Sequence, residues 1–143
     1  MTTAAIRRDI LKGWNVLIAD DEPDSLEVAT RILRYYGANV TTAGNGQEAL
    51  DLVVKAAPRF IISDLSMPVV DGWGLLYELK KNPDTADIPV IALTAHSMTG
   101  DRQRAVDAGF HNYLVKPLTA ANFMRDLLQL LMAEPSLAPE LGG

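Results

Sequence analysis

The chain has 143 residues, of which 48% are hydrophobic and 22% are charged. This length suits one α/β domain with its own hydrophobic core and is short for two. The net charge of -5 argues against a general nucleic-acid-binding or membrane-surface protein, because no basic stripe is present to meet phosphates. The lack of cysteine excludes disulfides and thiolate chemistry and fits a reducing compartment, so we expect a cytoplasmic protein.

The two ends of the chain differ in character from its middle. Residues 1–13 and 133–143 are expected to be extensions of one domain at residues 14–132. The first segment has charges where a signal peptide needs its apolar centre, and no apolar run approaches the roughly 18 residues of a membrane span. The last segment is rich in proline and glycine, which predicts a mobile tail. We expect a stand-alone domain, with a fragment of a longer protein as the alternative.

Short apolar runs alternate with longer helical patterns. The runs VLIA, FIIS and VIAL are apolar on both faces, as strands are when helices cover both sides of a sheet. Five strand–helix units in series predict a parallel sheet with right-handed crossovers. In chain order we expect strand Asn15–Ala19, helix Asp24–Tyr36, strand Asn39–Thr42, helix Gly46–Ala57, strand Phe60–Ser63, helix Gly72–Lys81, strand Val90–Leu93, helix Thr99–Ala108, strand Asn112–Val115 and helix Ala120–Met132.

Capping residues support these boundaries. Gly37 and Gly109 follow helical patterns and are expected to end them in the left-handed conformation, where a missing Cβ removes the steric penalty. Asn45, Asp71 and Thr119 are expected N-caps, because their side-chain oxygens can accept hydrogen bonds from the first turn of a helix.

Polar side chains lie at the carboxyl ends of four of the five expected strands. Asp20 and Asp21 follow the first, Asp64 the third, Thr94 the fourth and Lys116 the fifth. Each residue alone is common in turns and caps. The carboxyl ends of parallel strands meet at one edge of the sheet, where such folds bind ligands. We therefore expect these five residues to converge on one site.

Three carboxylates at one edge predict a bound divalent cation. Like charges about 4 Å apart repel by roughly 1 kcal/mol in water and by several-fold more near a protein surface. Mg2+, or alternatively Mn2+, would relieve this repulsion and leave room for a phosphoryl oxygen. Lys116 supplies a positive charge, Thr94 a hydroxyl, and the small Ala95 leaves space. This set can hold a phosphoryl group in line with a carboxylate nucleophile.

The chain resembles the receiver domain of bacterial two-component response regulators, the fold of the single-domain chemotaxis regulator. The resemblance covers about Trp14 to Met132. It rests on the ordered acid pair, Asp, Thr and Lys-Pro, and on the stretches DLSMPVVDGW and LTAHSMTGDRQRAVDAGFHNYLVKPL. It implies a flavodoxin-like (βα)5 three-layer sandwich with a doubly wound five-stranded sheet in strand order 2-1-3-4-5.

The resemblance also implies roles in phosphoryl transfer and metal binding. Asp64 would be the phosphoacceptor, taking its phosphoryl group from a phosphohistidine, and Lys116 would contact the phosphoryl oxygen. Asp21 and Asp64 would ligate Mg2+ directly, Asp20 through water, and Ser66 through its backbone carbonyl. The crowding of the acids would then serve to bind the metal and the phosphoryl group.

Further positions would act as a switch or flank the site. Thr94 would swing toward the phosphate, and Tyr113 would turn inward into the space vacated. The peptide bond before Pro117 is expected to be cis, which would place the preceding lysine. Ser66 and His96 occupy positions that influence the lifetime of the acyl phosphate in the family, although His96 is expected to be a loop residue without a catalytic role.

The expected function is a phosphorylation-activated switch rather than a turnover enzyme. Its expected partners are a sensor histidine kinase or phosphotransfer protein and a downstream protein. The downstream protein would dock on the face formed by the fourth helix, fifth strand and fifth helix. Direct binding to nucleic acid or membrane is not expected, and a phosphorylation-dependent homodimer is an open alternative. Outside the site, Glu22 is expected to favour the helix N-terminus, and His111 to be surface-exposed.

Two other functions remain alternatives. A pseudo-receiver would only dock on a partner, and it predicts that a site residue is missing, which is not the case. A Mg2+-dependent phosphatase with an aspartyl-phosphate would need two acids two residues apart on the first strand, whereas Asp20 and Asp21 are adjacent.

Overall fold

The computed structural model describes residues 6–94, 99–116 and 118–141. All strand pairs are parallel, and the sheet order is β2-β1-β3-β4-β5, which confirms the expected doubly wound fold. The strands are β1 (Asn15–Ala19), β2 (Asn39–Ala43), β3 (Phe60–Asp64), β4 (Val90–Thr94) and β5 (Asn112–Val115). The helices are α1 (Pro23–Tyr35), α2 (Gly46–Ala56), α3 (Gly72–Lys81), α4 (Thr99–Ala108), α5 (Phe123–Met132) and α6 (Ala138–Leu141). In these ranges no helix has the length and apolarity to cross a membrane.

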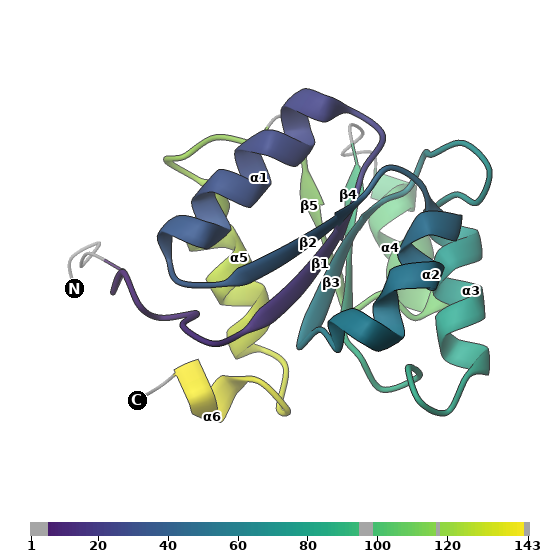
Figure 1. Ribbon diagram of the computed structural model, residues 1–143. Helices are drawn as coiled ribbons and strands as arrows, with labels where there is room; N and C mark the ends of the chain where they lie inside the picture. The colour runs from purple at the N-terminus through teal and green to yellow at the C-terminus, as the bar shows by residue number, and fades with distance from the viewer. Residues whose placement is uncertain (1–5, 95–98, 117, 142–143) are drawn as a thin grey trace.

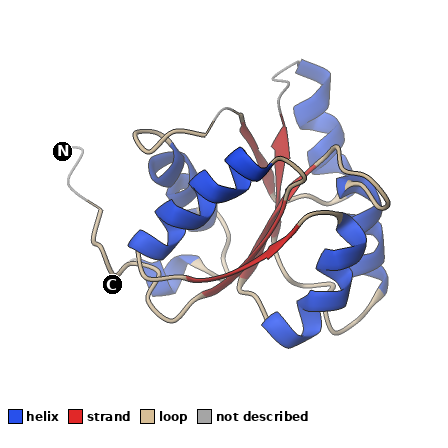
Figure 2. Cartoon of the chain, turned by 45° about the horizontal axis from the view of Figure 1, so that its top comes forward, coloured by secondary structure: helices blue, strands red, loops and turns tan. Residues whose placement is uncertain are grey.

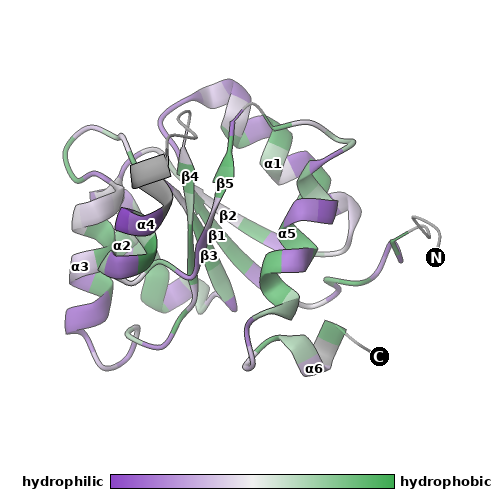
Figure 3. Cartoon of the chain, turned by 180° about the vertical axis from the view of Figure 1, so that it is seen from behind, coloured by the Kyte–Doolittle hydropathy of each residue, from purple (hydrophilic) through white to green (hydrophobic). Residues whose placement is uncertain are grey.

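The sheet lies between two layers of helices. Helices α1 and α5 cover one face, and α2, α3 and α4 cover the other (Figures 1 and 2). Successive strand residues point to opposite faces, so Ile18 and Ile62 enter the core under α1 and α5 while Leu17 and Ile61 enter the core under α2 and α3. This explains why β1, β3 and β4 are mostly apolar on both faces, as the hydropathy colouring of the central strands shows (Figure 3).

Most of the expected capping interactions are confirmed. Oδ1 of Asn45 accepts a hydrogen bond from the amide of Glu48 at 2.8 Å, and the Asp71 carboxylate caps α3 in the same way. Gly37 and Gly109 have φ values of 99° and 116°. The N-cap of α5 was predicted wrongly, because this helix begins at Phe123 and the hydroxyl of Thr119 instead accepts from the amide of Asn122, before the helix.

The terminal segments contribute to the core. Leu11 is fully buried, and Leu137 and Leu141 pack into the same cluster beneath α1 and α5. Glu134 Oε2 lies 3.3 Å from Nδ1 of His111, whose other ring nitrogen lies 2.7 Å from a carbonyl oxygen of α5. The His111 side chain is therefore only 16% exposed, which corrects the expected surface position. The packing of α6 likewise differs from the expected mobile tail.

Gly72 lets the start of α3 approach the end of β3. Its amide donates to the carbonyl oxygen of Leu65 at 3.1 Å. A Cβ at this position would lie 2.2 Å from the backbone oxygen of Asp64, a separation that requires the backbone to move. Gly72 therefore fixes how closely the helix packs against the strand that ends in Asp64.

Replacing this glycine is expected to destabilise the protein. We predict that Gly72→Ala lowers the free energy of unfolding by about 1–3 kcal/mol, because the added methyl group overpacks a backbone contact. Gly44→Ala is the matched control, since a Cβ there meets no atom within 4 Å. Denaturant unfolding measures both variants, and equal stability of the two would contradict the steric argument.

Candidate functional site

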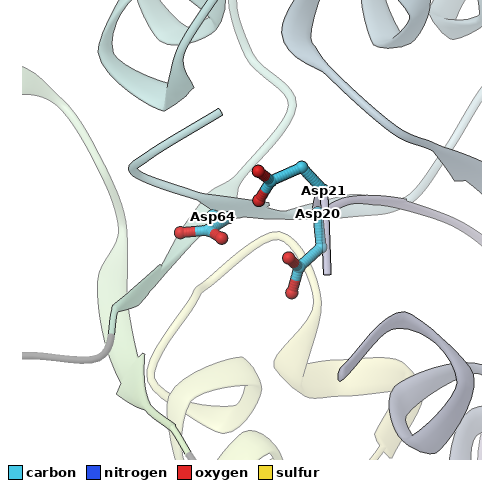
Figure 4. A group of neighbouring side chains, drawn as sticks. All are labelled: Asp20, Asp21 and Asp64. Carbon is cyan, nitrogen blue, oxygen red and sulfur yellow. The ribbon is translucent and has the colours of Figure 1, made fainter. Parts of the chain in front are cut away.

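The predicted site residues meet at the carboxyl edge of the sheet. Asp20 and Asp21 follow β1, whereas Asp64 and Thr94 are the last residues of β3 and β4. One carboxylate oxygen from each of Asp20, Asp21 and Asp64 lies within 4.8 Å of the others. Figure 4 shows these three side chains gathered at the ends of the two strands. Asp20 and Asp64 are buried, whereas Asp21 is exposed.

Lys116, directly after β5, brings a positive charge into this group. Its Nζ donates to Oδ2 of Asp64 at 3.0 Å and to Oδ1 of Asp20 at 3.2 Å, and it also contacts Oε1 of Glu22. The Lys116 side chain is 9% exposed, so these ion pairs are partly shielded from solvent. The backbone holds Lys116 as well, because its amide donates to the carbonyl oxygen of Thr94 at 2.8 Å.

Backbone amides orient the two buried carboxylates. The amide of Glu22 donates to Oδ1 of Asp20 at 2.9 Å, and the amide of Ser66 donates to Oδ1 of Asp64 at 3.1 Å. Oδ2 of Asp20 is buried and has no hydrogen-bond partner in the described structure, although it lies 3.2 Å from Lys116 Nζ. A buried carboxylate oxygen without a hydrogen bond can interact with a bound cation.

Burial and the neighbouring charges change the acid–base behaviour of the site. Burial, together with the nearby Asp64, raises the pKa of Asp20 from 3.8 to about 6, although the Glu22 amide and Lys116 oppose this change. Burial by itself would lower the pKa of Lys116, but its hydrogen bonds to Glu22 and Asp64 and the surrounding negative charge raise it above the ordinary value. Lys116 therefore stays charged, and one ammonium does not compensate all the acids around it.

The donor set fits a hard divalent cation. Carboxylate oxygens are the ligands that Mg2+ prefers, and it accepts one or two of them along with water and phosphate oxygens. The cluster of three carboxylates provides such ligands, and it includes Oδ2 of Asp20, which accepts no hydrogen bond in the described structure. The exposed Asp21 leaves one side of the group open to solvent.

The remaining predicted residues divide into two groups. Thr94 is buried at the same edge, Tyr113 is half-buried on β5, and Ser66 is exposed two residues after Asp64. Ala95, His96 and Pro117 lie outside the described residues, as does the expected cis bond before Pro117.

The contact between Glu22 and Lys116 was not predicted from the sequence. Glu22 was expected to favour the N-terminus of α1, but it makes no side-chain capping hydrogen bond there. Its carboxylate contacts Lys116 instead. The available signal was its place directly after the acid pair, whereas its contact with Lys116 depends on side-chain torsions and on a residue 94 positions away.

Comparison with known sequences identifies relatives of this chain. Residues 16–128 match the family of the response regulator receiver domain. The chain is 37% identical over 125 residues to the uncharacterized 14.6 kDa protein in the sodA1 3'region of Leptolyngbya boryana, covering 87% of this chain and 95% of that protein. It is 37% identical over 123 residues to the transcriptional regulatory protein PrrA of Mycobacterium tuberculosis, covering 86% of this chain and 52% of PrrA. The chain thus spans about half the length of that regulator.

The solved structures that are similar to this chain include a response regulator and a receiver domain, in agreement with the sequence relatives. The chemotaxis response regulator CheY4 of Vibrio cholerae has a TM-score of 0.76 at 29% identity, with 81% of this chain and 97% of that chain covered. The receiver domain of the sensor histidine kinase PA1611 from Pseudomonas aeruginosa, with a magnesium ion coordinated in its active-site cleft, has a TM-score of 0.73 at 31% identity, with 82% and 97% covered. The chain belongs to the response regulator receiver domain family of two-component signalling.

Proposed function

We propose that this chain is a switch in which Asp64 accepts a phosphoryl group from a phosphohistidine of a sensor histidine kinase or phosphotransfer protein. The observation that carries the proposal is the setting of the Asp64 carboxylate. It is 8% exposed, lies in one cluster with the Asp20 and Asp21 carboxylates, and accepts a hydrogen bond from Lys116 at 3.0 Å. The receiver family acts by this kind of phosphorylation.

The transfer step exchanges one bond to phosphorus for another. An oxygen of the Asp64 carboxylate forms a bond to phosphorus, the phosphorus–nitrogen bond of the phosphohistidine breaks, and its electron pair leaves with the imidazole. Lys116 Nζ, already hydrogen-bonded to Asp64, is positioned to meet a phosphoryl oxygen. The Thr94 hydroxyl, at the end of the adjacent strand β4, would donate to another phosphoryl oxygen.

Mg2+ is the proposed cofactor, with Mn2+ as an alternative. Asp21, Asp64 and the backbone carbonyl of Ser66 would hold it directly, and Asp20 through water. When bound, the metal would neutralise the charge that accumulates on the phosphoryl oxygens. Support comes from the carboxylate cluster and from the magnesium ion in the related PA1611 domain.

Phosphorylation would act on the surface formed by α4, β5 and α5. We propose that Thr94 moves toward the phosphoryl group and that Tyr113 on β5 turns inward, which changes the surface offered to a downstream protein. The chain would catalyse its own phosphorylation and dephosphorylation but no turnover of a separate substrate. We further propose that it acts in the cytoplasm without binding nucleic acid or membrane directly, and that phosphorylation can promote a homodimer.

Phosphorylation itself can be measured by intact-protein mass. We predict that incubation with Mg2+ and phosphoramidate adds one phosphoryl group to the wild type and none to Asp64→Asn, because the amide is a poor nucleophile. Hydroxylamine should remove the added group, as expected for an acyl phosphate. No mass gain in folded wild type with several donors, or an equal gain in both proteins, would refute the proposal.

The burial of the Asp20 carboxylate beside Asp64 has a measurable cost without metal. Since the pKa of Asp20 is raised from 3.8 to about 6, its ionised form destabilises the fold above pH 6, and this cost disappears as the pH falls toward 4. We predict that Asp20→Asn stabilises the metal-free protein at pH 7–8 by about 3 kcal/mol and has little effect near pH 4. Urea unfolding across this pH range gives the difference, and the exposed Asp87→Asn is the control. A pH-independent effect of Asp20→Asn would contradict the assigned cause.

A further inference from the structure

The position of Glu22 suggests a task other than helix capping. Glu22 precedes α1 with an extended backbone, φ −94° and ψ 113°, and its carboxylate makes no capping hydrogen bond. That carboxylate crosses to the end of β5 and contacts Lys116 Nζ. The Glu22 side chain is 61% exposed, whereas the other two carboxylates that Lys116 contacts, those of Asp20 and Asp64, are 1% and 8% exposed.

The three contacts account for the hydrogen-bonding capacity of Lys116. An ammonium group has three N–H donors, and carboxylates of Asp20, Glu22 and Asp64 accept from it. While a phosphoryl group approaches and Asp64 is still a free carboxylate, a phosphoryl oxygen can take a donor from Lys116 only if one of these carboxylates gives it up. The phosphoryl group must therefore compete with acids that already hold the ammonium.

The cost of losing Lys116 differs among the three acids. A buried carboxylate that loses its cationic partner keeps an uncompensated charge, which is strongly unfavourable. An exposed carboxylate exchanges its partner for water, so the ion pair contributes little net stability. Glu22 is the exposed member, so it can release Lys116 at the lowest cost.

We propose that Glu22 is a positioning residue that holds Lys116 in the unphosphorylated site and releases it when Asp64 is phosphorylated. This inference rests on the proposed phosphorylation of Asp64, and it assigns to Glu22 an influence on the rate of that phosphorylation. Glu22 competes with the incoming phosphoryl group for the same ammonium, and its negative charge opposes the approach of an anionic donor. Its presence therefore slows phosphorylation, and removing its charge accelerates it.

The test compares Glu22→Gln with wild type and with Glu27→Gln. Glu27 is a matched control on α1, because it is 62% exposed and pairs with Arg31 at 3.2 Å, one helical turn away. Phosphoramidate at saturating Mg2+ is the donor; Asp64 gains the phosphoryl group as the phosphorus–nitrogen bond breaks and ammonia leaves. We expect Glu22→Gln to be phosphorylated about two- to fivefold faster than the other two proteins, the range of an exposed ion pair.

A second readout follows Lys116 without phosphorylation. The 1H–15N NMR signal of its ammonium should be protected in wild type and Glu27→Gln and broadened by exchange in Glu22→Gln. Three results would overturn the role of Glu22 and leave the proposed phosphorylation of Asp64 standing. They are equal phosphorylation rates in wild type and Glu22→Gln, equal acceleration by both substitutions, and an unchanged Lys116 signal in Glu22→Gln. Absence of phosphorylation in all three proteins would overturn the proposed function and this inference with it.

Discussion

The ammonium of Lys116 joins segments that are far apart in the chain. It contacts the carboxylates of Asp20 and Asp64 across sequence separations of 96 and 52 residues. These contacts exist because parallel strands present their carboxyl ends at one edge, with β1 and β3 adjacent at the centre of the sheet. The site is therefore a consequence of the sheet's topology, and it forms only when β1, β3, β4 and β5 are assembled side by side.

One positive charge among several acids leaves the site electrostatically incomplete. Burial, together with the nearby Asp64, raises the pKa of Asp20, and its buried Oδ2 accepts no hydrogen bond in the described structure although Lys116 Nζ lies 3.2 Å away. A bound cation, as proposed for Mg2+, would relieve the repulsion among these acids and so stabilise the site. Natural folds retain strain of this kind at functional sites, and the rest of the structure provides the stability that permits it.

The sequence predicted the parts of the molecule that depend on local patterns. Strand positions followed from runs such as VLIA, and helix ends followed from Asn45, Gly37 and Gly109, because burial on both faces, side-chain capping and positive φ each have a sequence signal. The convergence of the acids followed from the parallel arrangement of the expected strands, whose carboxyl ends meet at one edge of the sheet.

Features that depend on tertiary contacts were not predictable in this way. Leu137 and Leu141 lie in a Pro- and Gly-rich segment, so composition indicated mobility although both leucines are buried. The start of α5 at Phe123 was shifted because a hydrogen-bonded turn precedes the helix. The contact of Glu22 with Lys116 depends on two flexible side chains that no local pattern relates.

The most direct test of the central claim, that the acids at this edge are arranged for a cation, is the stability of the protein with and without Mg2+. Denaturant unfolding of wild type and Asp21→Asn would be measured at neutral pH in both conditions. Mg2+ at about 100 times its dissociation constant should raise the free energy of unfolding of wild type by about 2.7 kcal/mol. Asp21→Asn, which loses an exposed carboxylate of the cluster, should gain much less. Equal stability of wild type with and without Mg2+ would contradict the account.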